Sequence, residues 1–347
     1  MPNMELWSQS CLHHVALGRL FYVALIIFSC VSFIGAQSAE DVQIVPRAPD
    51  EPGAVASRSS ADLLPASARA LRVDVNLVLV PVTVIDAKNR PVANLDSQNF
   101  ELFEGERRQE IKFFSIEDAP ISVGLIVDLS GSMANKIDEV RYAVNEFFVN
   151  ANPQDDYFVV TVSDTPKVLA NTTQSIGTIQ EKLGSVPPGG YTALLDAIYL
   201  AETKLRNARY QRKALVIVSD GGDNISRYSL REIKSLVQET DAIIYAMGLF
   251  DGLPFIRSIE EKFGRHLLDQ VTEATGGRTL PIDNAAKLPQ AAMLISRELR
   301  SQYVLGYNPN ADSRDGKWKK IRVKVNPQGG HSRVQAFYKK GYSASQY

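Results

Sequence analysis

Continuous apolar runs that alternate with segments of helical periodicity limit the fold of this chain more than any other feature. Runs of this length without polar alternation are typical of strands that are buried on both faces. Four of them are Val123–Val127, Tyr157–Val162, Ala214–Val218 and Ala242–Met247. Segments with apolar residues at helical spacing lie between and after them, among them residues 137–149, 192–205 and 285–300. This order predicts an α/β domain with a doubly wound, mainly parallel sheet of the Rossmann-like kind.

The two flanks of this domain have a different pattern, because apolar and polar residues alternate in them over short stretches. The clearest example is Trp318–Val325, WKKIRVKV, and turn sequences separate such stretches. Each flank has too few strands to close a core by itself. We therefore predict one β-sandwich made from residues 71–118 and 301–347, with the α/β domain of residues 119–300 inserted between its two parts.

The first 70 residues have the composition of an export signal followed by a linker. Leu20–Ala36 is an uncharged apolar run that follows Arg19 and ends in small residues, which predicts a signal peptide over residues 1–36. An uncleaved N-terminal anchor is the alternative, and the only way in which we expect this chain to meet a membrane. Residues 37–70 are expected to be a flexible linker. The mature protein is then periplasmic, secreted or on the cell surface.

Charge and composition argue against several classes of site. The formal net charge of -1 gives no reason to expect nucleic acid as a partner. Both cysteines, Cys11 and Cys30, lie in the leader, so the mature chain has neither disulfides nor thiol chemistry. Two of the four histidines also lie there, and His266 and His331 are isolated, which leaves no spacing typical of zinc ligands.

Polar side chains lie at the carboxyl ends of the predicted parallel strands or in the loops beside them, where such sheets bind their ligands. In chain order they are Asp128, Ser130 and Ser132 after the first run, Thr192 behind Gly189-Gly190, and Asp220 after the third run. Two carboxylates and three hydroxyls form a set of hard oxygen ligands. Such a set suits Mg²⁺, which we expect first, or Mn²⁺ or Ca²⁺, and argues against zinc or copper.

Each of these polar elements also has an ordinary structural interpretation. The two serines are common in turns and at helix starts, the threonine is a common N-cap, and Asp-Gly is a frequent turn pair. Their occurrence together, each at a strand end, favours the metal site. Among the neighbouring acids, Asp164 and Asp223 are candidates for supporting it, whereas Asp138 and Glu139 are expected to face solvent.

The sequence VDLSGSM, followed by the glycine-led Thr192 and by VSDG at residues 218–221, resembles the von Willebrand factor type A (VWFA) domain over residues 120–298. That family has a metal-ion-dependent adhesion site with the pattern DxSxS…T…D, and all five positions match. The resemblance implies that an open coordination position of the ion takes an Asp or Glu carboxylate from a partner protein. The flanks are similar to the exported bacterial VWFA-related domain proteins, best known from Acidobacteria. This similarity implies how the domains are arranged, but it does not imply an activity.

These observations predict a metal-dependent module for protein binding or adhesion, and not an enzyme. One alternative is a metal-dependent hydrolase of the phosphatase type, but such enzymes carry a second Asp where this chain has Ser130. No GxSxG, P-loop or GxGxxG sequence follows a predicted strand. Another alternative is a structural subunit in which the ion only stabilises the fold. In some relatives the last helix moves on ligation, and here residues 285–300 lead directly into the returning β segment.

Overall fold

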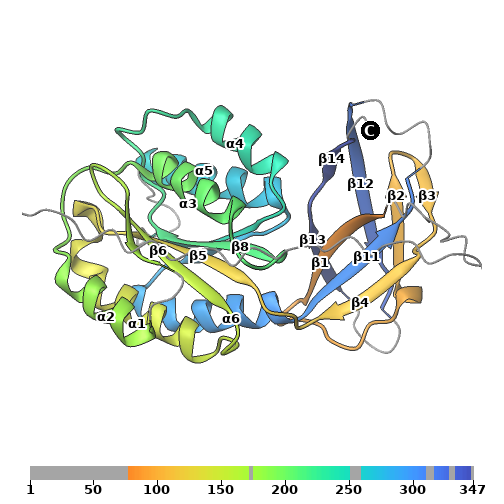
Figure 1. The fold of residues 1–347 in the computed structure, drawn as a ribbon, viewed down its shortest axis with the longest axis horizontal. Coiled ribbons are helices and arrows are strands. Elements are labelled where there is room, and N and C mark those ends of the chain that lie inside the picture. Colours follow the sequence, from red (N-terminus) through yellow and green to blue (C-terminus); the bar gives the residue numbers. More distant parts are fainter. Residues whose placement is uncertain (1–76, 172–174, 251–258, 310–315, 328–332, 345–347) are drawn as a thin grey trace, which may run out of the picture. The chain divides into compact units, whose positions relative to one another are not determined.

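The apolar runs form a six-stranded sheet in the computed structural model, which describes residues 77–171, 175–250, 259–309, 316–327 and 333–344. The strand order is β10-β9-β8-β5-β6-β7, and every pair is parallel except the one with the edge strand β7 (Figure 1). The strands are β5 (Ser122–Asp128), β6 (Asp156–Val162), β7 (Lys167–Ala170), β8 (Lys213–Ser219), β9 (Ile243–Leu249) and β10 (Thr279–Ile282). All seven residues of β5 are buried, as the continuous apolar pattern predicts.

Helices cover both faces of this sheet, so the doubly wound fold is confirmed (Figure 1). One face packs against α1 (Ile137–Val149), α2 (Ile176–Ser185) and α6 (Leu288–Arg300). The other packs against α3 (Leu194–Arg206), α4 (Leu230–Glu239) and α5 (Ile259–Thr275). Among the described residues, no helix has both the length and the apolar character needed to cross a membrane.

Two elements differ from the sequence prediction. The strand β7 was not predicted, because only its last residue, Ala170, is buried and its pattern is correspondingly weak. Apolar spacing in the sequence predicts a helix over His266–Thr275, but the helix α5 already begins at Ile259. Its first turns carry exposed apolar residues, such as Phe263, and the regular buried face begins only at Leu267.

The flanks of the chain form two antiparallel four-stranded sheets that share one core. Their orders are β13-β1-β11-β4 and β14-β12-β2-β3, and each sheet contains strands from before and after the α/β domain. The strands are β1 (Val78–Asp86), β2 (Phe100–Glu104), β3 (Arg107–Gln109), β4 (Phe113–Glu117), β11 (Gln302–Tyr307), β12 (Trp318–Val325), β13 (Val334–Tyr338) and β14 (Gly341–Ser343). The predicted insertion of an α/β fold into a β-sandwich is therefore confirmed. The signal peptide and linker predicted for residues 1–70 lie outside the described residues.

Two polar contacts, one exposed and one buried, join the α/β domain to the sandwich. Arg278 donates to both oxygens of Glu298 at the end of α6, and it also donates to the side chain of Asn89 beside β1 at 3.2 Å. The hydroxyl of Tyr245 in β9 lies 3.2 Å from that of Thr83 in β1. Because Glu298 is fully buried, its charge depends on the Arg278 guanidinium.

Candidate metal site

Asp128 is the last residue of β5 and is fully buried at the carboxyl edge of the sheet. Its Oδ1 accepts a hydrogen bond of 2.9 Å from the backbone N–H of Ser130. Its Oδ2 accepts one of 2.6 Å from the hydroxyl of Ser219, the last residue of the neighbouring strand β8. The Ser219 hydroxyl also accepts from the N–H of Gly221 at 2.9 Å. The carboxylate is therefore held in a fixed position between two strand ends.

Burial raises the pKa of Asp128 to about 6, against the opposing effect of hydrogen bonds from Ser130 and Ser219. The nearby carboxylate of Asp220 raises this pKa further. The groups with the largest influence on Asp128 are thus two serines and a second acid, none of them cationic. A buried carboxylate beside another carboxylate is an arrangement that a bound cation stabilises.

The hydroxyls of Ser130 and Ser132 lie 3.2 Å apart at the start of a 3-10 turn, Gly131–Lys136. Ser130 occupies the N-cap position of that turn, but its side chain makes no capping hydrogen bond. Thr192 precedes Ala193, which is the N-cap residue of α3. The ordinary interpretation of these hydroxyls as helix caps therefore does not hold for Ser130 or Thr192.

Backbone hydrogen bonds fasten together the three loops that carry the five predicted residues. The N–H of Gly131 donates to the carbonyl of Gly190 at 3.1 Å, and the N–H of Gly189 donates to that of Leu129 at 2.7 Å. On the other side, the N–H of Asn224 donates to the carbonyl of Thr192 at 3.0 Å. The loop of Asp128 is thus tied to the loop of Thr192, which is tied to the loop that follows Asp220.

Asp164 supports the middle loop, as the sequence suggests. Its Oδ1 accepts a hydrogen bond of 2.6 Å from the N–H of Tyr191. A Cβ atom on Gly190, which has a φ of +82°, would lie only 2.7 Å from the same oxygen. Glycine at this position therefore permits the close approach of Asp164, and Asp164 fixes the backbone just before Thr192.

The loop after β8 provides the caps that α3 lacks in its own sequence. The backbone N–H groups of Thr192 and Leu195 donate to the side chains of Asn224 and Asp223, at 2.9 and 3.2 Å. Asp196, in the first turn of α3, in turn accepts from the N–H of Arg227 at 2.9 Å. These reciprocal contacts hold the start of α3, with Thr192 just before it, against the loop that follows Asp220.

Residues 123–222, which include all five predicted ligands, match the family model of the von Willebrand factor type A domain. This part of the chain is a VWFA domain. No curated protein matches the sequence.

Several solved structures are similar to the chain. A von Willebrand factor type A protein from Catenulispora acidiphila matches with a TM-score of 0.45 and 12% identity, over 77% of this chain and 72% of that one. Proximal thread matrix protein 1 from the mussel byssus matches with a TM-score of 0.43 and 16% identity, over 62% and 50%. The pilus adhesin SpaC from Lactobacillus rhamnosus GG matches with a TM-score of 0.44 and 11% identity, over 73% and 49%. The chain thus spans about half the length of the latter two proteins.

Within the VWFA domain, the other acids near the motif have separate roles. Asp138 is exposed and accepts a hydrogen bond from Arg141, and Glu139 lies half-buried beside it in the first turn of α1.

Asp220, the last of the five predicted ligands, is half-buried, and its Oδ1 accepts from the N–H of Gly222 at 2.9 Å. The described residues contain no cluster of three or more His, Cys, Asp or Glu side chains able to hold a metal. The five predicted ligands do not form such a cluster, because three of them carry hydroxyls and only Asp128 and Asp220 are acids.

Sequence reasoning missed Ser219, Asn224 and Asp196, which position the predicted ligands. The segment SDGGDNISRYS, residues 219–229, is rich in capping residues, and that composition was an available signal. The composition did not show which helix these residues cap, because that helix, α3, lies earlier in the chain.

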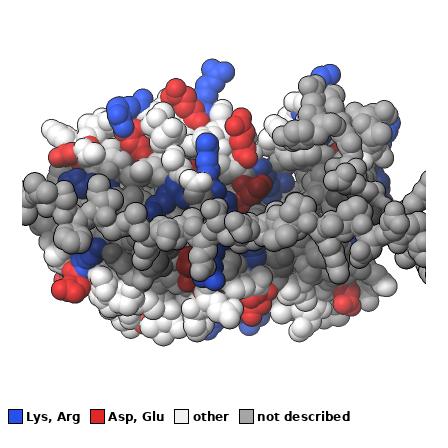
Figure 2. Space-filling view, in the orientation of Figure 1, with Lys and Arg blue, Asp and Glu red and all other residues white. Residues whose placement is uncertain are grey.

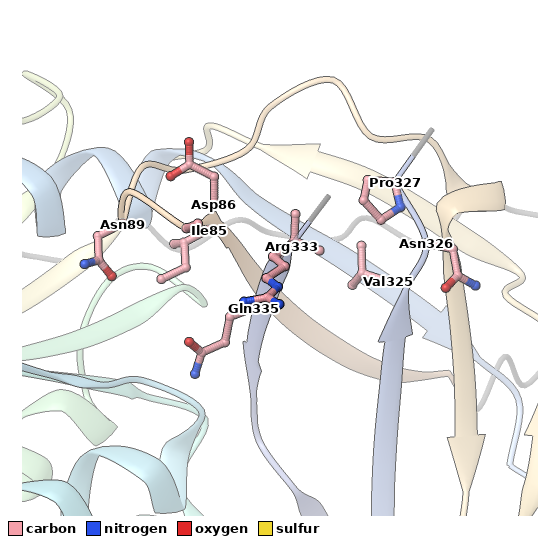
Figure 3. A pocket seen from close by; sticks show the side chains of 10 residues that line it. Ile85, Asp86, Asn89, Val325, Asn326, Pro327, Arg333 and Gln335 are labelled. Atoms are coloured by element: carbon pink, nitrogen blue, oxygen red, sulfur yellow. The ribbon is translucent and has the colours of Figure 1, made fainter. Parts of the chain in front are cut away.

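A cavity of about 840 Å³ lies in the sandwich and is separate from the VWFA strand ends (Figure 3). Ends of β1, β12 and β13 line it, through residues such as Ile85, Val325 and Gln335. Among its described lining residues the one carboxylate is that of Asp86, which is bound by Arg90 at 2.7 Å, and hydrogen bonds from Arg90 lower the pKa of Asp86 to about 2. The described lining of the cavity therefore offers no carboxylate without a cationic partner.

Proposed function

We propose that the VWFA domain of this chain binds a divalent cation through Asp128, Ser130, Ser132, Thr192 and Asp220, and through it a carboxylate of a partner protein. The observation that carries the proposal is the buried Asp128 carboxylate beside two serine hydroxyls, neither of which caps a helix. Mg²⁺ is the ion we expect first, with Mn²⁺ and Ca²⁺ as alternatives. We also propose, from Leu20–Ala36, that the protein is exported, which fractionation of the source cells tests.

The spacing of the two serine hydroxyls supports this choice of ions. Neighbouring oxygens around an octahedral ion lie about 2.9 Å apart for Mg²⁺ and about 3.4 Å apart for Ca²⁺, given their usual bond lengths. The separation of 3.2 Å between Ser130 Oγ and Ser132 Oγ lies between these values. Either ion therefore fits with a movement of a few tenths of an ångström.

The donor set also explains why an outside carboxylate would bind. Hydroxyls are neutral, so they leave most of the positive charge of an ion uncompensated, and that charge attracts an anionic side chain. Ser132 is exposed, as is Tyr191 beside Thr192, with 65% of its surface accessible. A partner side chain can therefore reach this edge of the sheet from solvent.

Binding fits the geometry better than catalysis. The residue that would act as a nucleophile in a phosphatase-like enzyme is Asp128, which is fully buried. Both of its carboxylate oxygens already accept hydrogen bonds, from Ser130 and Ser219. In-line attack would require one of these oxygens to leave its hydrogen bond and reach a bulky phosphoryl group, whereas a small cation can be bound with both hydrogen bonds kept.

Calorimetric titration of the full chain with each of the three ions tests the ligand set. Ser132→Ala and Thr192→Ala should each weaken binding by about tenfold, because each removes an oxygen donor. Ser185→Ala is the matched control, since that hydroxyl donates only to a helix carbonyl, of Lys182, and should leave the affinity unchanged. Equal affinities in all four proteins would refute the assignment.

The open coordination position can be measured separately with Mn²⁺. Water bound to the ion enhances solvent proton relaxation, and acetate, as a minimal carboxylate, should reduce the enhancement by displacing that water. An ion that only stabilises the fold gives a thermal shift without any response to acetate. That outcome would contradict the binding role and favour the structural alternative.

A further inference from the structure

The outer face of the sheet β14-β12-β2-β3 carries a ladder of basic side chains on β12. Ile321 and Val323 of this strand point into the core of the sandwich. The alternate residues Lys320, Arg322 and Lys324 therefore point outward, about 7 Å apart along the strand. Lys320 and Lys324 are exposed, and the Arg322 side chain is 42% exposed. Figure 1 shows β12 between β14 and β2 in this sheet.

An aromatic ring continues the ladder at one end. Trp318 lies two residues before Lys320 and is 44% exposed. A Cβ atom on Gly341 would lie 2.5 Å from the indole Nε1 and 2.6 Å from Cε2. Because Gly341 pairs with Lys320, this position is on the same outer face. The absence of a side chain at Gly341 thus lets the indole lie against the strand as a platform beside the cations.

Phe103 of β2 orders the cations in the middle of the ladder. It pairs with Arg322, and its ring lies 4.4 Å from the Arg322 guanidinium and 5.4 Å from the Lys324 ammonium. Two glutamates also lie close, Glu101 at 3.6 Å from Arg108 and Glu106 at 3.7 Å from Arg322. The three cations of the ladder and Arg108 outnumber these two carboxylates, so the face keeps a net positive charge. Its ion pairs are exposed and therefore weak.

We propose that this face of the sandwich binds an extended anionic polysaccharide, with a sugar ring on Trp318 and carboxylates or sulfates along Lys320, Arg322 and Lys324. A flat ring with an adjacent row of cations matches a polymer of sugar rings with regularly repeated charge. The face lies on the sandwich, so its ligand is additional to the partner proposed for the VWFA domain.

Two observations favour a polysaccharide over single-stranded nucleic acid. Nucleic acids bind with several successive bases stacked on free aromatic rings, whereas here Phe103 is occupied by cations and leaves the Trp318 indole as the platform. The two glutamates and the formal net charge of -1 also suit a ligand of lower charge density than a phosphate backbone.

Titration of the full chain with polygalacturonate in EDTA tests the proposal, because chelation removes any contribution of the metal site. Dextran, which is uncharged, should not bind. The double variant Lys320→Gln/Lys324→Gln should bind roughly fivefold more weakly, and the slope of log K against log salt should fall by about two. The arginine pair Lys320→Arg/Lys324→Arg should retain binding. The matched control Lys88→Gln/Lys262→Gln removes two exposed lysines elsewhere and should bind as the wild type does.

Three results would overturn the proposal. One is the absence of saturable binding to polygalacturonate, and another is equal affinity of the Lys320→Gln/Lys324→Gln protein and its control. The third is tighter binding of an oligo(dT) strand than of polygalacturonate, which would identify the ladder as a nucleic-acid site. Asp128→Asn should not change polygalacturonate binding in EDTA, which separates this test from that of the metal site.

Discussion

The Ser219 hydroxyl donates a hydrogen bond of 2.6 Å to Oδ2 of Asp128, although the two residues are 91 positions apart in the chain. The contact crosses between the ends of β8 and β5, which are adjacent parallel strands. The Ser219 hydroxyl also accepts a hydrogen bond from the backbone N–H of Gly221. This one hydroxyl therefore positions both the carboxylate of Asp128 and the loop that carries Asp220. We therefore regard Ser219 as a positioning residue of the candidate metal site.

Ser219→Ala should reduce the affinity for Mg²⁺ by about tenfold, since removal of a group that orients a ligand typically costs between tenfold and a hundredfold. It should also lower the free energy of unfolding by about 1–2 kcal/mol, because Asp128 loses a buried donor. Calorimetric titration and urea denaturation measure the two effects. An affinity equal to that of the control Ser185→Ala would show that Ser219 does not orient the site.

Gly221→Ala should destabilise the protein strongly. A Cβ atom there would lie 2.3 Å from the carbonyl oxygen of Gly264 in α5, and the residue has a φ of +79°. The backbone conformation alone costs about 1–2 kcal/mol, and the clash with α5 adds to it. Gly105→Ala is the control, because its φ is +59° and nothing lies within 4 Å of the added atom. Urea denaturation should show a clearly larger loss for Gly221→Ala, and equal losses would contradict the tight contact with α5.

Arg278→Leu should lower the free energy of unfolding by about 3–5 kcal/mol, because it leaves the fully buried Glu298 without its cation. The burial of Glu298 already raises the pKa of this group against the opposing effect of Arg278. Arg90→Leu breaks an ion pair in which the arginine is 68% exposed, and it should cost less than about 1 kcal/mol. Similar costs for the two variants would argue against a structural role of the buried pair.

Glu202 should make the stability depend on pH. It is 1% exposed, its Oε1 has no hydrogen-bond partner in the described structure, and burial raises its pKa to about 7 against the opposing effects of Thr240, Arg206, Lys213 and Lys339. The folded protein therefore binds this proton more tightly than the unfolded chain, whose glutamate has a pKa near 4.5. Proton binding by Glu202 therefore stabilises the folded protein fully below pH 4.5. This contribution to the free energy of unfolding, about 3 kcal/mol, is lost as the pH rises to about 7.

The variant Glu202→Gln isolates this effect, because its amide is neutral at every pH. Relative to the wild type, it should gain up to about 3 kcal/mol between pH 4.5 and pH 8. Urea denaturation across this range measures the difference. A constant difference would show that Glu202 titrates with an ordinary pKa in the folded protein.

The fold was predictable from the sequence because burial itself leaves a pattern. The fully buried strand β5 appears as a continuous apolar run, whereas β12 appears as an alternation of apolar and basic residues. Short or exposed elements leave little signal, which is why β7 and the first turns of α5 were not predicted. Their structure depends on neighbouring strands and helices and not on local periodicity.

The candidate site was predictable only in part. Spacing along the chain identified Asp128, Ser130 and Ser132, a strand end identified Asp220, and the glycine-led start of a helix identified Thr192. The supporting contacts of Ser219 and Asn224 depend on which loops lie side by side, and single serines and asparagines are common in any turn. For the same reason, nothing in the sequence indicates that Arg278 pairs with Glu298.

Titration of Mg²⁺ into the full chain, compared with its Asp128→Asn variant, tests the central claim most directly. Asparagine keeps the shape of the side chain, and its Oδ1 can still accept from Ser130 while its amide group donates to Ser219, but it removes the negative charge. We predict saturable binding of one ion to the wild type and affinity at least tenfold lower in the variant, with unchanged circular dichroism. Equal affinity in the two folded proteins, or no binding of Mg²⁺, Mn²⁺ or Ca²⁺ to the wild type, would contradict the assignment of a metal site to this domain.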